Sequence, residues 1–189
     1  MVQSETMKTS LKLGLLTLVL FGGGGYLLIE FTQNTSLWDV LFDGKNLINQ
    51  LLAGTGSGLV ASLIAISIIS RKFFASERDF YHGLIARWNL SYGQMIFLSW
   101  CAGIGEELFF RGGLQPLLGN IWTSVLFVFL HGYLNPRNWR ISIYGGVMVG
   151  IIYGFGLLFE HVGLISAMIA HAILDMVLFR YLDKYNKFG

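Results

Sequence analysis

The sequence predicts an all-α, polytopic membrane protein with about six transmembrane helices plus one or two interfacial helices. Hydrophobic residues make up 54% of its 189 residues and charged residues only 13%, whereas soluble domains carry about 25% charged residues. Long charge-free stretches recur along the chain, and most are close to the roughly 20 apolar residues that a helix needs to cross a bilayer. A net charge of +2 is too small for a surface that neutralises phosphates, so we expect no nucleic-acid partner.

Six stretches are long and apolar enough to be predicted as membrane spans. They are residues 12–30, 54–70, 92–117, 119–134, 141–159 and 163–182. The third span is continuous only if it accommodates Glu106, Glu107 and Arg111 within the helix. The first span lacks a following cleavage pattern of small residues, so we expect a permanent helix rather than a signal peptide.

Two segments between the spans are predicted to form helices at the membrane surface. Residues 36–52 place aliphatic residues at roughly helical spacing, with Asp39, Asp43 and Lys45 interspersed. This mixture is typical of an interfacial helix. Residues 71–90 have a similar character and are expected on the opposite side of the membrane.

The basic residues predict the orientation of the chain. With a cytoplasmic N-terminus, all but Lys45 and Arg111 of the 13 lysines and arginines lie in inner loops and tails, as the positive-inside rule requires. We therefore expect cytoplasmic N- and C-termini in a cell inner or plasma membrane, with the lipid bilayer as a partner. Domain linkers are not evident, so residues 1–189 are interpreted as one integral-membrane domain.

Ionisable side chains inside the predicted spans are the strongest functional signal. Each costs several kcal/mol at the bilayer centre, so a group of them points to a functional site. They are Glu106, Glu107, Arg111, His131, His171 and Asp175.

The spacing of these residues indicates separate roles. Glu107 and Arg111 are four residues apart, so they share a helix face and can form an ion pair. Glu106 points about 100° away from Glu107, where an unpaired acid facing a cavity suits a general base. His171 and Asp175 are also four apart, so Asp175 can orient the imidazole.

Three motifs follow one another on separate predicted helices. They are E-E-x-x-x-R at Glu106–Arg111, F-x-x-x-H at Phe127–His131 and H-x-x-x-D at His171–Asp175. This ordered triplet resembles the CPBP intramembrane protease family, also called the type II CAAX prenyl endopeptidase and bacteriocin-processing (Abi) family. The resemblance covers the motif-bearing core, residues 92–182. It implies hydrolysis of peptide bonds in membrane-associated peptides or proteins, of the CAAX type or the bacteriocin and leader-peptide type.

The resemblance also implies a role for each residue. Glu106 and His131 would activate the attacking water, while His171 and Asp175 would stabilise the developing oxyanion. The Glu107–Arg111 ion pair would hold the architecture. Some family members carry asparagine at the position of Asp175, and the aspartate here favours a His–Asp pair or metal ligation over pure oxyanion donation.

Whether a metal takes part is left open by the sequence. Two histidines with carboxylates form a credible zinc site that leaves a position for water. The ligands of a Zn²⁺ ion would then be Glu106, His131, His171 and Asp175. The resemblance favours a metal-free, glutamate-dependent hydrolase over a metalloprotease, and the same residues serve either mechanism.

Two other classes of protein remain as alternatives. A non-catalytic membrane scaffold or bacteriocin-immunity protein that retains the fold would keep its full effect after Glu106→Ala. A proton- or ion-coupled transporter would use the buried carboxylates as relays, but paired half-repeats or broken helices are not evident. The glycine stripe of Gly146, Gly150 and Gly154 is interpreted as close helix packing rather than as a substrate groove.

Overall fold

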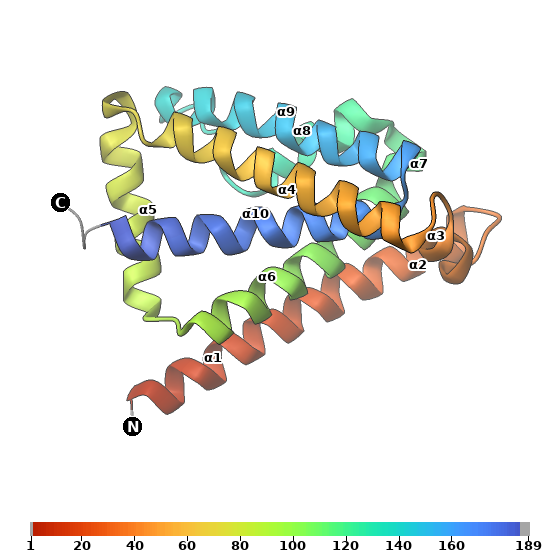
Figure 1. Ribbon diagram of the computed structural model, residues 1–189, viewed down its shortest axis with the longest axis horizontal. Coiled ribbons are helices and arrows are strands. Elements are labelled where there is room, and N and C mark those ends of the chain that lie inside the picture. Colours follow the sequence, from red (N-terminus) through yellow and green to blue (C-terminus); the bar gives the residue numbers. More distant parts are fainter. Residues whose placement is uncertain (1, 186–189) are drawn as a thin grey trace.

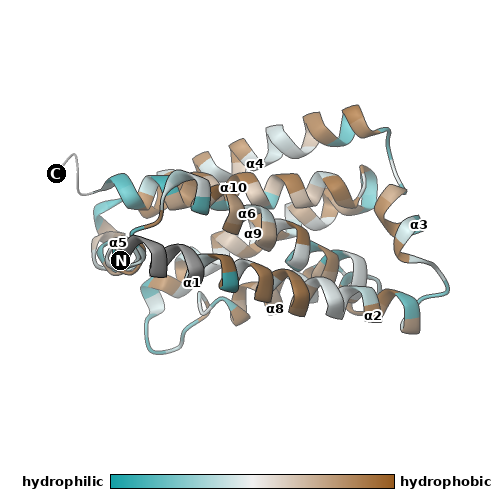
Figure 2. Cartoon of the chain, turned by 90° about the horizontal axis from the view of Figure 1, so that it is seen from below, coloured by the Kyte–Doolittle hydropathy of each residue, from teal (hydrophilic) through white to brown (hydrophobic). Residues whose placement is uncertain are grey.

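The computed structural model describes residues 2–185, with side chains from Thr9 onward, and these residues form helices without any strand (Figure 1). Among the described residues, four helices are long and apolar enough to cross a membrane: Thr9–Thr32, Leu47–Ile69, Trp139–His161 and Leu164–Lys184. Coloured by hydropathy, the long helices are mostly hydrophobic along their length, and hydrophilic residues gather toward the ends of the bundle (Figure 2). The predicted class, an all-α polytopic membrane protein, is confirmed.

The first span is one long helical rod with a π-helical turn in its middle. It consists of α1 (Val2–Thr17), the π-helical segment η1 (Leu18–Gly22) and α2 (Gly23–Thr32). The backbone stays helical through both junctions, so the predicted span 12–30 lies inside this rod.

The predicted interfacial helix 36–52 is wrong as a single helix. Helix α3 (Leu37–Phe42) begins at a capping box formed by Ser36 and Asp39, but it ends after only six residues. Gly44 then adopts φ +102°, a left-handed conformation that favours glycine, and the Asn46 side chain caps a new helix. That helix is α4 (Leu47–Ile69), so the second half of the expected interfacial segment is the start of a span.

The predicted surface helix within 71–90 is present. A short 3₁₀ turn, η2 (Lys72–Phe74), leads into α5 (Ala75–Trp88). Helix α5 lies across one end of the bundle, and α3 lies at the other end (Figure 1). The rod of α1 begins, and the last helix ends, at the α5 end (Figure 1).

The third predicted span, 92–117, is confirmed as uninterrupted helical backbone. It is built from α6 (Tyr92–Glu107), the π-helical segment η3 (Leu108–Leu114) and α7 (Gln115–Leu118). Because the helix continues past Arg111, the two glutamates lie near its middle rather than at its end.

The predicted span 119–134 is corrected, because helix α8 (Asn120–Leu130) has only 11 residues. At 1.5 Å per residue it extends about 16 Å, roughly half of the hydrocarbon core. Gly132 has φ +77° and ends the helical path, and residues 131–138 return without regular structure to α9 (Trp139–His161). Such backbone is tolerated at membrane depth where it lines a cavity.

The last helix, α10 (Leu164–Lys184), lies at the centre of the bundle and packs against α4, α6 and α9. Small residues make this possible: a Cβ at Gly58 of α4 would lie 2.7 Å from the carbonyl oxygen of Ala170, and one at Gly103 of α6 would lie 2.7 Å from that of Met168. These contacts place His171 directly opposite the glutamate pair of α6.

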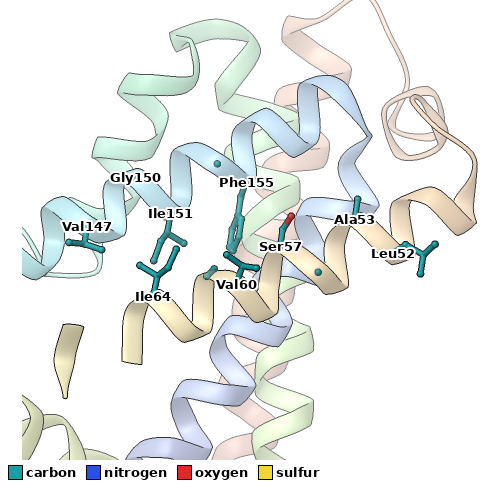
Figure 3. A pocket seen from close by; sticks show the side chains of 12 residues that line it. Leu52, Ala53, Ser57, Val60, Ile64, Val147, Gly150, Ile151 and Phe155 are labelled. Atoms are coloured by element: carbon teal, nitrogen blue, oxygen red, sulfur yellow. The ribbon is translucent and has the colours of Figure 1, made fainter. Parts of the chain in front are cut away.

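The glycine stripe of α9 does not mediate close packing, contrary to the sequence-based expectation. A Cβ at Gly146, Gly150 or Gly154 would meet nothing within 4 Å. Gly150 and Gly154 instead line an apolar groove of about 690 Å³ between α4 and α9 (Figure 3). The spacing places glycines on one helix face, but it does not say whether another helix covers that face.

Candidate active site

Glu107 is the centre of a buried charge cluster. It is completely buried, and its two carboxylate oxygens have different partners. Oε2 accepts a hydrogen bond from Nε of Arg111 at 3.0 Å, and Oε1 lies 2.8 Å from Nδ1 of His171. Glu107 therefore connects the middle of α6 with the central helix α10.

Arg111 is also completely buried and ties several helices together. Its Nη2 donates to the carbonyl oxygen of Ile152 in α9 at 2.8 Å, and its Nη1 donates to Oε1 of Gln115 at 3.1 Å and to Oγ of Ser124 in α8 at 3.4 Å. A buried guanidinium needs such a set of acceptors, since a charge without partners is expensive inside the membrane. The ion pair with Glu107 thus has the architecture of a structural clamp.

Glu106 differs from its neighbour because it is buried but poorly satisfied. Its side chain is about 10% exposed, and its Oε2 lies 3.3 Å from Nε2 of His131. Within the described part of the chain, this oxygen has no hydrogen bond of acceptable geometry. A buried carboxylate oxygen without a bond is rare and points to a functional role.

His131 is held in place by the end of α8. Its Nδ1 lies 2.8 Å from the carbonyl oxygen of Phe127, and a carbonyl can only accept, so Nδ1 carries a proton. Nε2 is then the nitrogen that faces Glu106, free to exchange a proton with it. The ring also stacks on that of Phe127, with centroids 4.3 Å apart and an interplanar angle of 15°.

Phe127 brings the second histidine to the same place. Its ring contacts that of His171 edge-on, with centroids 5.5 Å apart. Nε2 of His171 lies 3.5 Å from Oδ2 of Asp175, which is long for a hydrogen bond. The two imidazoles therefore lie against the same phenyl ring, each beside a carboxylate.

A cavity of about 220 Å³ reaches this cluster from the α5 end of the bundle. His131 and Asp175 line it, together with side chains from α5, α9 and α10, whereas Glu106 and His171 are not part of its wall. They are connected to the cavity through their partners His131 and Asp175. The larger groove between α4 and α9 is lined by no ionisable side chain and offers no acid–base chemistry.

The donor residues do not group as a metal site in this structure. Among residues 2–185, no three histidine, cysteine, aspartate or glutamate side chains are arranged to hold a metal ion. The four candidate ligands stand as two separate pairs, and Nδ1 of His171 is already engaged by Glu107.

All six ionisable residues predicted from the sequence lie in one connected region. The spacing could predict the pairs Glu107–Arg111 and His171–Asp175, because each pair shares a helix turn. The contact between Glu107 and His171, 64 residues apart, has no local signal. The sequence-based prediction did not include Gln115, although a polar side chain inside an apolar span is a signal that could have identified it.

The fold and this cluster define an integral membrane protein with a buried carboxylate–histidine site. Residues 88–177 match the type II CAAX prenyl endopeptidase Rce1-like family, which confirms the resemblance seen in the three motifs over the segment that carries them. The matched family is one of intramembrane CAAX-type proteases.

A curated relative and the solved structures add little about function. The uncharacterized protein YpbD of Bacillus subtilis is 38% identical over 86 residues, covering 44% of this chain and 42% of the relative. The match thus spans less than half of that protein's length. No solved structure matches the chain.

Proposed function

We propose that this chain is an intramembrane endopeptidase in which Glu106, assisted by His131, activates a water molecule to attack a peptide carbonyl. The observation that carries the proposal is the contrast between two adjacent glutamates. Glu107 has a partner on each oxygen, whereas Oε2 of Glu106 is occluded, lacks a hydrogen bond and lies 3.3 Å from His131. Of the two glutamates, only Glu106 has a carboxylate oxygen without a hydrogen-bond partner in the described chain.

The reaction follows from these positions. Glu106 accepts a proton from water as the water oxygen bonds to the carbonyl carbon, and Nε2 of His131 shares that proton. Nε2 of His171, only loosely held by Asp175, donates to the developing oxyanion. The proton then passes to the nitrogen of the leaving amine as the C–N bond breaks, which restores the carboxylate.

The substrate is proposed to be a peptide or protein segment at the membrane, of the CAAX type or the leader-peptide type. The cavity opens toward α5, at the end of the bundle where α1 begins and α10 ends (Figure 1). With the orientation expected from the basic residues, this is the cytoplasmic side.

Cleavage of a quenched-fluorescence peptide library by the purified chain in detergent tests this function. Wild type is compared with Glu106→Gln and His131→Ala, and with Glu30→Gln and His161→Ala as matched controls at exposed positions. We expect a loss of activity of at least 100-fold in the first two variants, a magnitude typical of acid–base groups, and none in the controls.

A strong chelator, followed by addition of zinc, distinguishes the two mechanisms. Activity that is indifferent to chelator supports the glutamate-dependent hydrolase, whereas loss and rescue by zinc would make the same residues metal ligands. Full cleavage by Glu106→Gln would refute the proposed mechanism. Absence of cleavage by wild type, with a biological effect that survives Glu106→Ala, would support a scaffold or immunity protein instead.

A further inference from the structure

Four tyrosines surround the cavity that leads to the candidate active site. Tyr81 comes from α5, Tyr133 from the segment after α8, Tyr144 from α9 and Tyr181 from α10. They share the wall with His131 and Asp175. Neither the three motifs nor the proposed mechanism uses any of them.

The hydroxyl groups of these tyrosines are not equivalent. Tyr181 pairs with Oγ of Ser70 at 2.7 Å. Among residues 9–185, the hydroxyls of Tyr81, Tyr133 and Tyr144 make no hydrogen bond, and none of them is a fully buried atom. Because these three hydroxyls keep some exposure and have no partner in the described chain, they are donors available to a molecule that enters the cavity.

Tyr133 lies at the centre of this group. Its ring is parallel to that of His131, with an interplanar angle of 2° and centroids 6.5 Å apart. It also contacts the rings of Tyr144 at 5.7 Å and Tyr81 at 5.9 Å. Tyr133 therefore continues the stack of Phe127 and His131 into the cavity, where Tyr144 meets its ring edge-on and Tyr81 meets it at a tilt.

The fold holds Tyr133 in this position. A Cβ at Gly145 of α9 would lie 2.5 Å from the carbonyl oxygen of Tyr133, so glycine at this position lets the irregular segment pack directly on α9. The backbone N–H of Tyr133 donates to the carbonyl of Val128. A residue held from both sides is suited to positioning a ligand.

We infer that the hydroxyls of Tyr133, Tyr81 and Tyr144 bind backbone carbonyls of an extended peptide next to the bond that is cut, with Tyr133 closest to the reaction. This inference rests on the proposed function. A peptide at membrane depth has no water to satisfy its carbonyls once its helix is opened. Donors fixed in the cavity wall replace those lost bonds, and they select extended segments over intact helices.

Steady-state kinetics with the best-cleaved library peptide tests the inference. For Tyr133→Phe we expect KM to rise about tenfold, the equivalent of 1.4 kcal/mol, with kcat changed less than about twofold, because a bond made equally in ground and transition states affects KM alone. Tyr181→Phe is the matched control, since its hydroxyl is already bound to Ser70, and we expect its KM to be unchanged.

A thioamide placed in turn at each peptide bond near the cleavage site identifies the partner carbonyl. Sulfur accepts hydrogen bonds poorly, so one position should weaken binding about tenfold in wild type and have no effect in Tyr133→Phe. A merely structural role of Tyr133 would lower activity regardless of the thioamide. Unchanged KM in Tyr133→Phe, or an equal thioamide effect in both proteins, would overturn the inference.

Binding measurements keep this test independent of cleavage. Fluorescence anisotropy of the labelled peptide, or of the whole labelled library if none is cleaved, is measured on Glu106→Gln with and without Tyr133→Phe. Weaker binding with Tyr133→Phe supports the peptide site, and equal binding refutes it. Retained cleavage by Glu106→Gln would contradict the proposed function while leaving the peptide-binding result valid.

Discussion

At the scale of single residues, two adjacent glutamates of the same helix have opposite environments. Glu107 is completely buried with an arginine and a histidine as partners, whereas one oxygen of Glu106 has no hydrogen bond. Removing the partner of a paired buried charge destabilises the protein. A buried carboxylate oxygen without a partner already destabilises the native protein, and destabilising groups of this kind are typical of functional positions.

This contrast predicts different effects of the same substitution. We expect Glu107→Gln to lower the free energy of unfolding by about 3–5 kcal/mol, because it leaves Arg111 buried without its counter-charge. We expect Glu106→Gln to keep or raise the melting temperature while it removes activity. Thermal unfolding in detergent measures both variants, and a larger loss of stability in Glu106→Gln would contradict the assignment.

Arg111 should tolerate no conservative replacement. Its guanidinium donates to a carboxylate, an amide oxygen, a hydroxyl and a backbone carbonyl on four helical segments. Lysine keeps the charge but lacks the planar fork of donors. We expect Arg111→Lys to destabilise by about 2 kcal/mol or more, since several buried acceptors lose their donors. A melting temperature equal to that of wild type would show that the network carries little stability.

At the scale of elements, the central helix depends on glycines of its neighbours. Gly58 of α4 contacts the backbone of α10, whereas Gly150 of α9 faces an open groove. We expect Gly58→Ala to lower stability by about 1–3 kcal/mol through overpacking. Gly150→Ala should be neutral or stabilising by up to about 1 kcal/mol, because alanine is the better helix former. Equal effects in a thermal assay would mean that another surface covers the α9 stripe.

The start of α5 provides a pH-dependent contact. Burial raises the pKa of the Glu77 carboxyl, but hydrogen bonds from Ser76 and Asn138 outweigh it and lower that pKa below its ordinary value of 4.5. Because the pKa is lower in the folded state, the contribution of Glu77 is complete above about pH 4.5 and disappears as the pH falls through the lowered value.

Melting temperatures of wild type and Glu77→Gln, compared from neutral to acidic pH, check this contact. We expect wild type to be the more stable at neutral pH and the difference to vanish in acid. Asp79→Asn, which removes an exposed carboxyl from the same helix, is the control for the change in net charge. A difference in melting temperature between wild type and Glu77→Gln that stays the same at every pH would refute the pH dependence of this contact.

The π-helical segments are the second feature at this scale. Segments η1 and η3 lie side by side, and the ring of Phe21 in η1 contacts those of Phe109 and Phe110 in η3. π-Helical turns inside α-helices frequently mark functional sites. Here η3 directly follows Glu107 and contains Arg111, so the altered helix geometry helps to position the Glu107–Arg111 ion pair.

At the scale of the whole molecule, the orientation predicted from the basic residues can be tested directly. Lys45 lies near the α3 end and Lys72 near the α5 end, both exposed, and the native Cys101 is buried. In intact spheroplasts, a membrane-impermeant maleimide should label Lys45→Cys, and it should label Lys72→Cys only after permeabilisation. The reverse pattern would place the cavity mouth on the outer side of the membrane.

Composition and local spacing were sufficient for the membrane class, for most spans and for the two pairs four residues apart. These properties depend on apolar length and helical periodicity, which are local. The same reasoning failed at residues 36–52, where Gly44 and the Asn46 cap divide the segment, and at 119–134, where Gly132 ends α8 halfway across. In both segments, one or two turn residues end a helix that the apolar composition alone predicts to continue.

The sequence by itself determined which ionisable side chains inside the apolar spans are candidates for function, because charge and apolar length are properties of a short stretch of sequence. Only the tertiary structure decided which of them meet. Glu107 reaches His171 because glycines let α10 approach α6, and Glu106 faces His131 because α8 stops short. Both contacts join residues far apart in the chain, and their geometry depends on packing between helices, about which the spacing within each helix carries no information.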